Sequence, residues 1–480
     1  MLTLRQYQEI ARRTLERLVR EGATRVCVVS PCGSGKTVLA VALIQDLLRL
    51  GGRVLFLAHR QELILQTSRK LDSALQPHGI IMAGNKRVAP SSSVQVASTP
   101  TIVRRLDRVG NFDFIIQDEC HHSRSDTAMR IYDRFPTAPI IGLTATPERN
   151  DGRGLGELFH ELLVVTSTRE LIDQGYLVDY RAWVFDSDAL DALDDVRVVD
   201  GDFDREGAAK VMGQRAVVGS IVEEWANRSA GRRSLYFATS VDRSKELVTE
   251  FNGLRQHGGP VCYAEHIDAS ATDADRLALM GPGGRLERGE TTLLSNCNIA
   301  TEGTDIPCIE TIGLAAPTMA WSRFSQQVGR GFRPSPLTGK ADLLILDHAR
   351  CILMHGRPDD PREFTLSPDR VRRNRPKRQD FREMHACAKC GCIYPEIRAR
   401  CGECGEPNPG WTPASVQHLD TDRVLEIRRA PTDAESKRAR FLQLVEEQRR
   451  SRRRAGFAVQ WFTREFGHEP AVEWLAEGGS

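Results

Sequence analysis

A chain of 480 residues is long enough for several domains, and a hydrophobic content of 40% is ordinary for a globular protein. No apolar run reaches 18 residues and the N-terminus lacks an apolar core, so we expect a cytoplasmic protein without a membrane span, a signal peptide or a membrane partner. The formal net charge is only +2, but arginine clusters at 370–378 and 449–454 place the basic surplus in the C-terminal tail, where it suits an anionic polymer.

The N-terminal part of the chain alternates strand-like and helix-like segments from residue 24 to about 165. Such alternation predicts a parallel sheet covered by helices on both faces, and ligands bind these sheets at the C-terminal ends of the strands. Amphipathic stretches separate the expected strands, which are Val26–Val29, Val54–Ala58, Val94–Ala97, Phe114–Gln117 and Ile140–Thr144.

A glycine-rich loop follows the first expected strand, because residues 30–37 read SPCGSGKT and precede a helix-like stretch at 38–48. In a strand–loop–helix arrangement, successive backbone N–H groups converge on phosphate oxygens. Lys36 would reach the β- and γ-phosphates of ATP, and the Thr37 hydroxyl would bind Mg²⁺. Ser30 stands where the general pattern has its first glycine, so a plain glycine-rich turn is the alternative for the loop alone. The residues of the loop predicted to bind the nucleotide are Gly33, Ser34, Gly35, Lys36 and Thr37.

An acidic string, QDECH at residues 117–121, ends another buried strand-like run that begins at Phe112. At the C-terminal end of a strand, Asp118 would join the Mg²⁺ shell, and Glu119 would orient or deprotonate the attacking water. The loop and the acidic pair together predict an ATPase and make the plain-turn alternative a poor one.

A second alternating block runs from about 166 to 358 and has no phosphate loop of its own. Two similar blocks that share one phosphate loop suggest a nucleotide clamped between two lobes. In the glycine-containing segment 326–333, Arg330 and Arg333 would supply positive charge to the γ-phosphate as arginine fingers. The alternative for each arginine is a surface ion pair. The expected strands of this block are Ser234–Ala238, Val261–Ala264, Thr292–Ser295, Thr311–Leu314 and Leu343–Asp347.

The segment 181–230 carries no recognisable chemistry. Its acidic part, 186–204, is typical of a loop or a small insertion, and a helix is expected at Val217–Ala230. We assign it no catalytic or binding role.

Five of the twelve cysteines lie close together near residue 400, and the others lack framework spacing, which argues against a secreted disulfide fold. Cys387, Cys390, Cys401 and Cys404 form the pattern C-x₂-C-x₁₀-C-x₂-C, which can close a tetrahedral shell around Zn²⁺. Four protein ligands leave no open position, so we expect a structural ion, with Cys392 outside its shell and a redox C-x-x-C as the alternative. The neighbouring arginine clusters favour a nucleic-acid grip for this module.

Taken in order, these segments resemble a superfamily 2 helicase of the DExH type over about residues 4–350. The resemblance implies an α/β fold of two tandem RecA-like parallel-sheet lobes, followed here by a four-cysteine zinc ribbon and a basic helical tail. The DECH string, the compact layout and the cysteine cluster are similar to RadD-type and prophage-encoded helicases. On this basis we expect an ATP-binding lobe at 1–165, a second lobe at 166–358, a basic linker at 359–380, the zinc ribbon at 381–410 and the tail at 411–480.

The resemblance also implies roles for individual residues. Gln8, in the element LRQYQ ahead of the first strand, would recognise adenine. Thr144 and Thr146, in the string TATP, would couple hydrolysis to strand movement. The remaining implied contacts are Gly303, Asp305 and Gln326 with the nucleotide, and Arg60, Thr99, Thr239 and Thr301 with nucleic acid.

The sequence therefore predicts an ATP-dependent DNA helicase or translocase that uses ATP and Mg²⁺, with DNA expected in preference to RNA. Two alternatives stay open: a double-strand translocase that separates no strands, and a nucleic-acid-binding adaptor whose ATPase is vestigial. Both halves of the nucleotide site lie in one chain, so a monomer could hydrolyse ATP. We find no nuclease constellation, so nuclease activity would need a partner protein, and repair, phage replication and defence are all open as pathways.

Overall fold

The computed structural model describes residues 3–122, 126–148, 154–185, 188–297, 299 and 305–367, together with a few residues from 427 onward. The chain divides into two compact units, Met1–Ile427 and Arg428–Ser480, and strand β16 (Ile427–Arg429) lies at their boundary. The cysteine pattern at 387–404 lies outside the described residues, and within them no group of histidine, cysteine and acidic side chains is placed to hold a metal ion. Nor does any helix of the described ranges have the length and apolarity needed to cross a bilayer.

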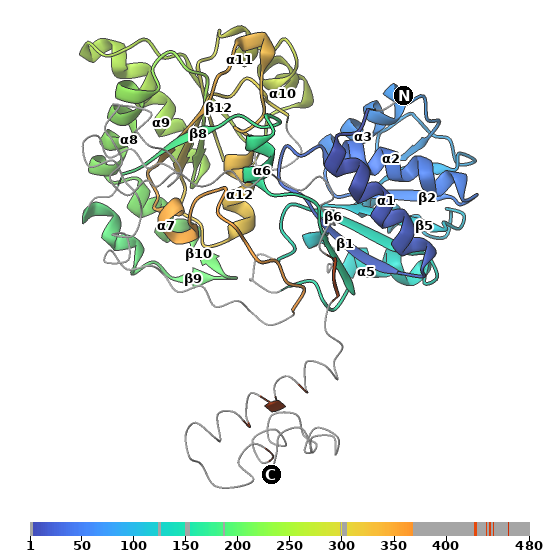
Figure 1. The fold of residues 1–480 in the computed structure, drawn as a ribbon. Helices are drawn as coiled ribbons and strands as arrows, with labels where there is room; N and C mark the ends of the chain where they lie inside the picture. Colours follow the sequence, from blue (N-terminus) through green and yellow to red (C-terminus); the bar gives the residue numbers. More distant parts are fainter. Residues whose placement is uncertain are drawn as a thin grey trace. The chain divides into compact units, whose positions relative to one another are not determined.

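The first sheet is parallel, and within residues 25–164 its strand order is β7-β1-β6-β5-β2-β4-β3 (Figure 1). Because β6 lies between β1 and β5, the loop after β1 and the acidic pair at the end of β5 emerge at the same edge, with Thr144 between them. The strands are β1 (Arg25–Val29), β2 (Val54–Ala58), β3 (Gly79–Ile81), β4 (Val94–Ser98), β5 (Phe114–Asp118), β6 (Ile140–Thr144) and β7 (Glu161–Val164).

Helix α1 (Gln6–Arg20) shows why the helices of this part form where they do. Its apolar residues recur every three or four positions, and this stripe is buried against α2 (Lys36–Arg49), while charged residues occupy the other face. Helix α2 is apolar over most of its length and is buried more completely. The other helices of the first lobe are α3 (Gln61–Ser73), α4 (Thr99–Ile102), the short η1 (Cys120–His122) and α5 (Asp126–Arg134).

The second sheet is also parallel, with the order β12-β13-β11-β14-β15-β8 (Figure 1). Its inner strands β11, β14 and β15 are buried along their whole length, as expected for a sheet covered on both faces. The strands are β8 (Tyr180–Val184), β11 (Ser234–Ala238), β12 (Ala264–Ile267), β13 (Leu293–Asn296), β14 (Thr311–Ala315) and β15 (Leu343–Asp347).

Between β8 and β11 the chain forms a small addition to this sheet. It contains the short helix η2 (Asp188–Leu193), an antiparallel hairpin of β9 (Val198–Val199) and β10 (Asp202–Phe203), and helices α7 (Arg205–Met212) and α8 (Arg215–Arg228). The other helices of the second lobe are α6 (Thr168–Asp173), α9 (Val241–Gly253), η3 (Leu254–His257), α10 (Asp273–Met280), α11 (Arg285–Arg288), α12 (Trp321–Gly329), η4 (Pro336–Thr338) and α13 (Cys351–His355).

Nine of the ten predicted strands are confirmed, each with both ends within one residue of the observed strand. The helix expected at Val217–Ala230 corresponds to α8. The prediction of a strand at Val261–Ala264 is wrong, because pairing with β13 begins only at Ala264. Val261 and Tyr263 have the side chains of a strand but are 45% and 58% exposed in the preceding loop. The two parallel sheets are consistent with tandem RecA-like lobes.

Candidate ATP-binding site

The loop between β1 and α2 has a backbone that glycine alone accepts easily. Gly33 and Gly35 both have φ of 82°, in the left-handed region that residues with a Cβ atom rarely adopt. Space is restricted as well, since a Cβ at Gly35 would lie 2.6 Å from Gln8 Nε2 and a Cβ at Gly33 would lie 2.9 Å from Leu177. The two glycines therefore set the shape of the loop and let other segments pack closely against it.

Ser30, which replaces the first glycine of the general pattern, stabilises the loop through hydrogen bonds. The Ser30 hydroxyl donates to Ser34 Oγ at 2.7 Å, and the Ser34 hydroxyl donates to the Pro31 carbonyl at 2.7 Å. Lys36 Nζ donates to the Ser30 carbonyl at 3.2 Å, so its ammonium group lies against the loop. The serine in place of glycine thus closes the loop rather than disrupting it.

The predicted adenine-recognising element is anchored on the same loop. Gln8 is buried, and its Nε2 donates to the Ser34 carbonyl at 2.9 Å while its Oε1 accepts from the Arg5 backbone N–H at 3.0 Å. The Tyr7 hydroxyl donates to the same Ser34 carbonyl, a contact that the sequence did not indicate. Gln8 therefore supports the loop, and its contact with adenine stays a prediction.

The acidic pair is held at the end of β5 in an uncommon conformation. Glu119 has φ of 47°, which costs conformational energy for a residue other than glycine and is characteristic of functional turns. Asp118 Oδ1 accepts the Glu119 backbone N–H at 3.0 Å, and both side chains are buried. Within the described residues Glu119 Oε2 has no hydrogen-bond donor, although His121 Nδ1 lies 3.5 Å away. A buried carboxylate oxygen without a donor can accept a hydrogen bond from a ligand or a water molecule.

A short chain of polar contacts links this carboxylate to the string TATP. His121 Nδ1 lies 3.2 Å from Thr144 Oγ1, and the Thr144 hydroxyl donates to the Thr146 carbonyl at 2.7 Å. Thr144 in turn accepts the Thr146 backbone N–H at 3.0 Å. His121 received no role from the sequence, although its position two residues after Glu119 was a usable signal. The structure thus connects Glu119 with both residues predicted to couple hydrolysis to movement.

Side chains from both lobes line one cavity of about 210 Å³ around the loop. From the second lobe, Arg333 forms an ion pair with Asp305. The lobes meet closely here, because a Cβ at Gly329 would lie only 2.4 Å from Cys32 Cβ. The predicted nucleotide and catalytic residues that line this cavity are Gly33, Gly35, Lys36, Thr37, Asp118, Glu119, Asp305, Arg330 and Arg333.

Lys340 holds the segment 326–333, here called the finger segment, through hydrogen bonds to its backbone carbonyls. The sequence did not indicate this role for Lys340. Its Nζ donates to the carbonyls of Gly331, Arg333 and Pro307, the last two at 2.8 and 3.4 Å. Burial lowers the pKa of Lys340 to about 7, against the attraction of Glu310, which raises it. The lysine therefore ties both sides of the finger segment to the loop that contains Asp305.

Some predicted residues lie elsewhere. Ser34 and Gln326 do not line the cavity; Gln326 is instead buried in α12. Thr301 and Gly303 lie outside the described residues. Among the residues predicted to contact nucleic acid, Arg60 precedes α3, and Thr99 donates to the Ala58 carbonyl at 3.2 Å. The remaining one, Thr239, lines a separate pocket at the end of β11.

The first lobe matches a known family. Residues 1–149 match the family ResIII, described as the res subunit of type III restriction enzymes. A 51.5 kDa protein of a Lactococcus phage (isolate 7-9) is 28% identical over 381 residues, which cover 79% of this chain and 77% of the phage protein. IRC3 of Saccharomyces cerevisiae, which is named a putative ATP-dependent helicase, is 31% identical over 349 residues, or 69% of this chain. The chain spans about half (49%) of the length of IRC3.

A solved structure shares the fold. The ATP-dependent type ISP restriction-modification enzyme LlaBIII, bound to DNA, has a TM-score of 0.51 and 19% identity over 72% of this chain and 27% of that one. At this identity the likeness concerns the fold alone. The family match of the first lobe and the sequence relatives indicate an enzyme, an ATPase similar to ATP-dependent helicases.

Proposed function

We propose that the chain hydrolyses Mg-ATP between its two lobes and uses the cycle to move along DNA, as a helicase or translocase. The observation that carries the proposal is the shared cavity. Phosphate-loop and acidic groups of the first lobe face Arg330 and Arg333 of the second across it. Among the described residues that line the cavity, the groups that hold phosphate come from the first lobe and the arginines that neutralise developing charge come from the second.

Each lining group then has a role in hydrolysis. Lys36 holds the β- and γ-phosphates, and Glu119 orients the attacking water with the oxygen that has no donor among the described residues. The oxygens of Thr37 and Asp118 line the same cavity and suit Mg²⁺, which prefers oxygen ligands and neutralises phosphate charge when bound. Arg330 supplies charge to the γ-phosphate when the lobes are closed.

Movement on nucleic acid would begin with the contact chain from Glu119 to Thr146. A change in the hydrogen bonding of Glu119 on hydrolysis would reach Thr144 through His121, at the strand end between the two motifs. Arg60 and Thr99 on one lobe and Thr239 on the other would hold the phosphate backbone in turn. We favour DNA because the relative LlaBIII is described as bound to DNA.

The test is ATP hydrolysis by the wild-type chain and by Glu119→Gln, with no polymer, single-stranded DNA, duplex DNA or RNA. We expect strong stimulation by DNA in the wild type and a loss of roughly 100-fold or more in the variant. Stimulation by RNA alone would replace the DNA assignment. No hydrolysis under any condition would favour the adaptor with a vestigial ATPase. Unwinding assays against triplex-displacement assays then separate a helicase from a double-strand translocase.

We also propose a structural Zn²⁺ ion on Cys387, Cys390, Cys401 and Cys404, which rests on their spacing because these residues lie outside the described ranges. Such a module after the second lobe, together with the DECH string and the compact layout, makes the chain similar to RadD-type helicases and supports a role in DNA repair. Metal analysis of the purified full chain should give one zinc per chain, and Cys390→Ser should lose it. Cys392→Ser is the matched control, and equal zinc loss in this variant would contradict the assigned ligand set.

A further inference from the structure

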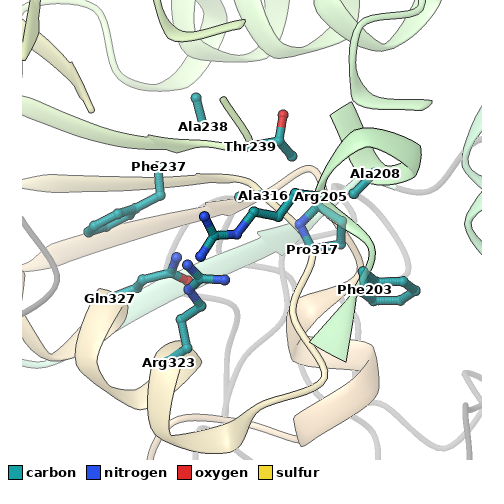
Figure 2. A pocket seen from close by; sticks show the side chains of 10 residues that line it. All are labelled: Phe203, Arg205, Ala208, Phe237, Ala238, Thr239, Ala316, Pro317, Arg323 and Gln327. Atoms are coloured by element: carbon teal, nitrogen blue, oxygen red, sulfur yellow. The ribbon is translucent and has the colours of Figure 1, made fainter. Parts of the chain in front are cut away.

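A cavity of about 590 Å³, here called the side cavity, lies beside the ATP site between α3 of the first lobe and α10 of the second. It is separate from the small pocket at the end of β11, which includes one of the residues predicted to contact nucleic acid (Figure 2). Gln66, Lys70 and Asp305 line both the side cavity and the ATP cavity, so the two adjoin at these residues. The side cavity also reaches Ser73 and Leu277, which are exposed. It therefore extends from the ATP site to the surface.

The two cavities meet at the phosphate end of the ATP site. Asp305 lies at the junction and forms an ion pair with Arg333, which is predicted to neutralise the γ-phosphate. Helix α3, which carries Gln66 and Lys70, follows β2, and β2 pairs with β5, the strand that ends in the acidic pair. Gln8, the residue predicted to recognise adenine, lines neither cavity. The end of a bound ATP that faces the side cavity is therefore the γ-phosphate.

One wall of the side cavity is a polar face of α3. Four residues of this helix line the wall at spacings of three and four positions, which places them on one face: Gln66, Arg69, Lys70 and Ser73. From the first to the last the helix rises by about 10 Å. Arg69 and Lys70 are both exposed, and within the described residues neither side chain has an ion pair or a hydrogen bond. Two cations without a partner therefore line the way from the junction to the surface.

The carboxylates that line the side cavity all have partners in the described part of the chain. The pairs are Glu62 with Arg276, Asp273 with Gln61, Glu287 with the Gly283 backbone N–H, and Asp305 with Arg333. The wall opposite α3 is otherwise largely apolar and includes Leu277, Met280 and Ile306, which offer no hydrogen bond that could hold a phosphate. Among the described residues of this cavity, positive charge without a partner thus lies on α3, and an anion would follow that wall.

We propose that the inorganic phosphate formed by ATP hydrolysis leaves through the side cavity, guided along α3 by Lys70 and then by Arg69. In hydrolysis the water oxygen bonds to the γ-phosphorus and gives up a proton, while the bond to the oxygen shared with the β-phosphate breaks and leaves its electron pair on ADP. ADP stays at the phosphate loop, and the freed phosphate anion faces Lys70 at the junction. The proposal rests on the proposed hydrolysis of ATP and adds the route by which one product departs.

The experiment compares phosphate formation with phosphate release in a single turnover of the full chain, with Mg-ATP and the polymer that stimulates hydrolysis most. Acid-quenched samples measure the phosphate formed, and a fluorescent phosphate-binding protein measures the phosphate released. Arg69→Glu reverses a charge that lines the side cavity but not the ATP cavity. Phosphate should form at the wild-type rate in this variant and be released about fivefold more slowly, because a like charge then faces the anion.

Two further variants separate the effect of charge from general damage to the first lobe. Arg69→Lys keeps the charge, so it should release phosphate at the wild-type rate. Lys86→Glu is the matched control, because Lys86 is also an exposed cation of the first lobe but lines neither cavity. Its rates of formation and release should both equal those of the wild type.

The width of the route is tested at its outer end. Ser73 is exposed, and its hydroxyl donates to the Arg69 carbonyl of the same helix at 2.9 Å, so its replacement should leave the thermal midpoint nearly unchanged. Ser73→Trp places a large ring at the side cavity and should introduce a lag between formation and release. Ser73→Ala leaves the cavity open and should behave as the wild type.

Release that keeps pace with formation in both Arg69→Glu and Ser73→Trp would overturn the proposal. Equal slowing of formation and release in Arg69→Glu would also overturn it, because the charge would then act on the chemistry. Failure of the proposed function looks different, since the wild type itself would then form no phosphate in the acid-quenched samples with any polymer.

Discussion

In the first lobe, the groups proposed to act on ATP follow directly from strand ends, since Lys36 begins the helix after β1 and Asp118 ends β5. In the second lobe, Arg330 and Arg333 follow α12 and depend on distant residues: Asp305 pairs with Arg333, and Lys340 holds the carbonyls around it. The first half of the site is thus built by local sequence and backbone geometry. The second half is built by tertiary contacts. Substitutions in the two lobes should therefore impair the site in different ways.

The largest effect is expected in the locally built half. Lys36→Ala should lower ATP hydrolysis by roughly 100-fold or more, because Lys36 is the lysine of the phosphate loop itself, whereas Lys70, which also lines the cavity, belongs to α3. Steady-state hydrolysis and nucleotide binding should fall together. Lys86→Ala, at an exposed lysine of the same lobe, should behave as wild type. A Lys36→Ala variant with near-normal turnover would refute the assignment of the loop.

The contact between the halves can be broken by a single methyl group. Gly329→Ala places a Cβ atom 2.4 Å from Cys32 Cβ, so the finger segment must withdraw from the loop. We expect turnover to fall about 10- to 100-fold, because a displacement of catalytic groups by about 1 Å can cost this much in rate. The helix itself should tolerate the change, because alanine is a good helix former.

Removal of the opposing Cβ atom should relieve this clash. In the double variant Cys32→Gly with Gly329→Ala, at least part of the turnover should return, measured against Cys32→Gly alone. If the two changes are simply additive, the close approach of the lobes is not the cause.

The tertiary half should also depend on pH through Lys340. Burial lowers its folded-state pKa to about 7 from 10.5, so between these values the unfolded chain keeps a proton that the folded chain loses. Stability contributed by this group therefore rises as pH increases from about 7 toward 10.5, and the cost of the buried charge is fully present below pH 7.

Comparison with Lys340→Met isolates this effect from other titrations. The thermal midpoint of the wild type, relative to that of the variant, should increase between pH 7 and about pH 9. Glu310, Asp342, Cys308 and Arg232 also act on Lys340, and all four remain in the variant. Parallel profiles of the two proteins would contradict a lowered pKa.

The smallest effect is expected at an ion pair between the lobes whose two residues do not line the ATP cavity. Arg276 Nη1 of α10 lies 2.7 Å from Glu62 Oε1 of α3, and both side chains are partly exposed. Exposed pairs contribute about 0.2–1 kcal/mol, so Glu62→Gln and Arg276→Gln should each change turnover or KM by no more than about fivefold. A double-mutant cycle should give a small coupling that disappears at high salt. Large, salt-independent coupling would instead make this pair a main lock between the lobes.

Much of the fold could be predicted from the sequence because parallel strands in a covered sheet are short apolar runs. Val54–Ala58 and Ile140–Thr144 were found at their true bounds for this reason. The strand at Val261–Ala264 was misplaced because its side chains suit a strand but meet no partner strand before Ala264. Strand β8 was missed because its sequence mixes polar and apolar residues, and pairing with β15 alone fixes its place.

By itself the sequence was enough to predict ATPase chemistry in the first lobe, because a phosphate loop and an acidic pair are each contiguous and their action depends on local backbone geometry. It could not place His121 beside Thr144, because these two residues lie 23 positions apart. Nor could it place Lys340 on the carbonyls of the segment 326–333, because no motif marks those carbonyls. Only the tertiary structure decided those positions. Contacts of this kind depend on which strands become neighbours in a sheet, a property of the whole fold that no single segment encodes.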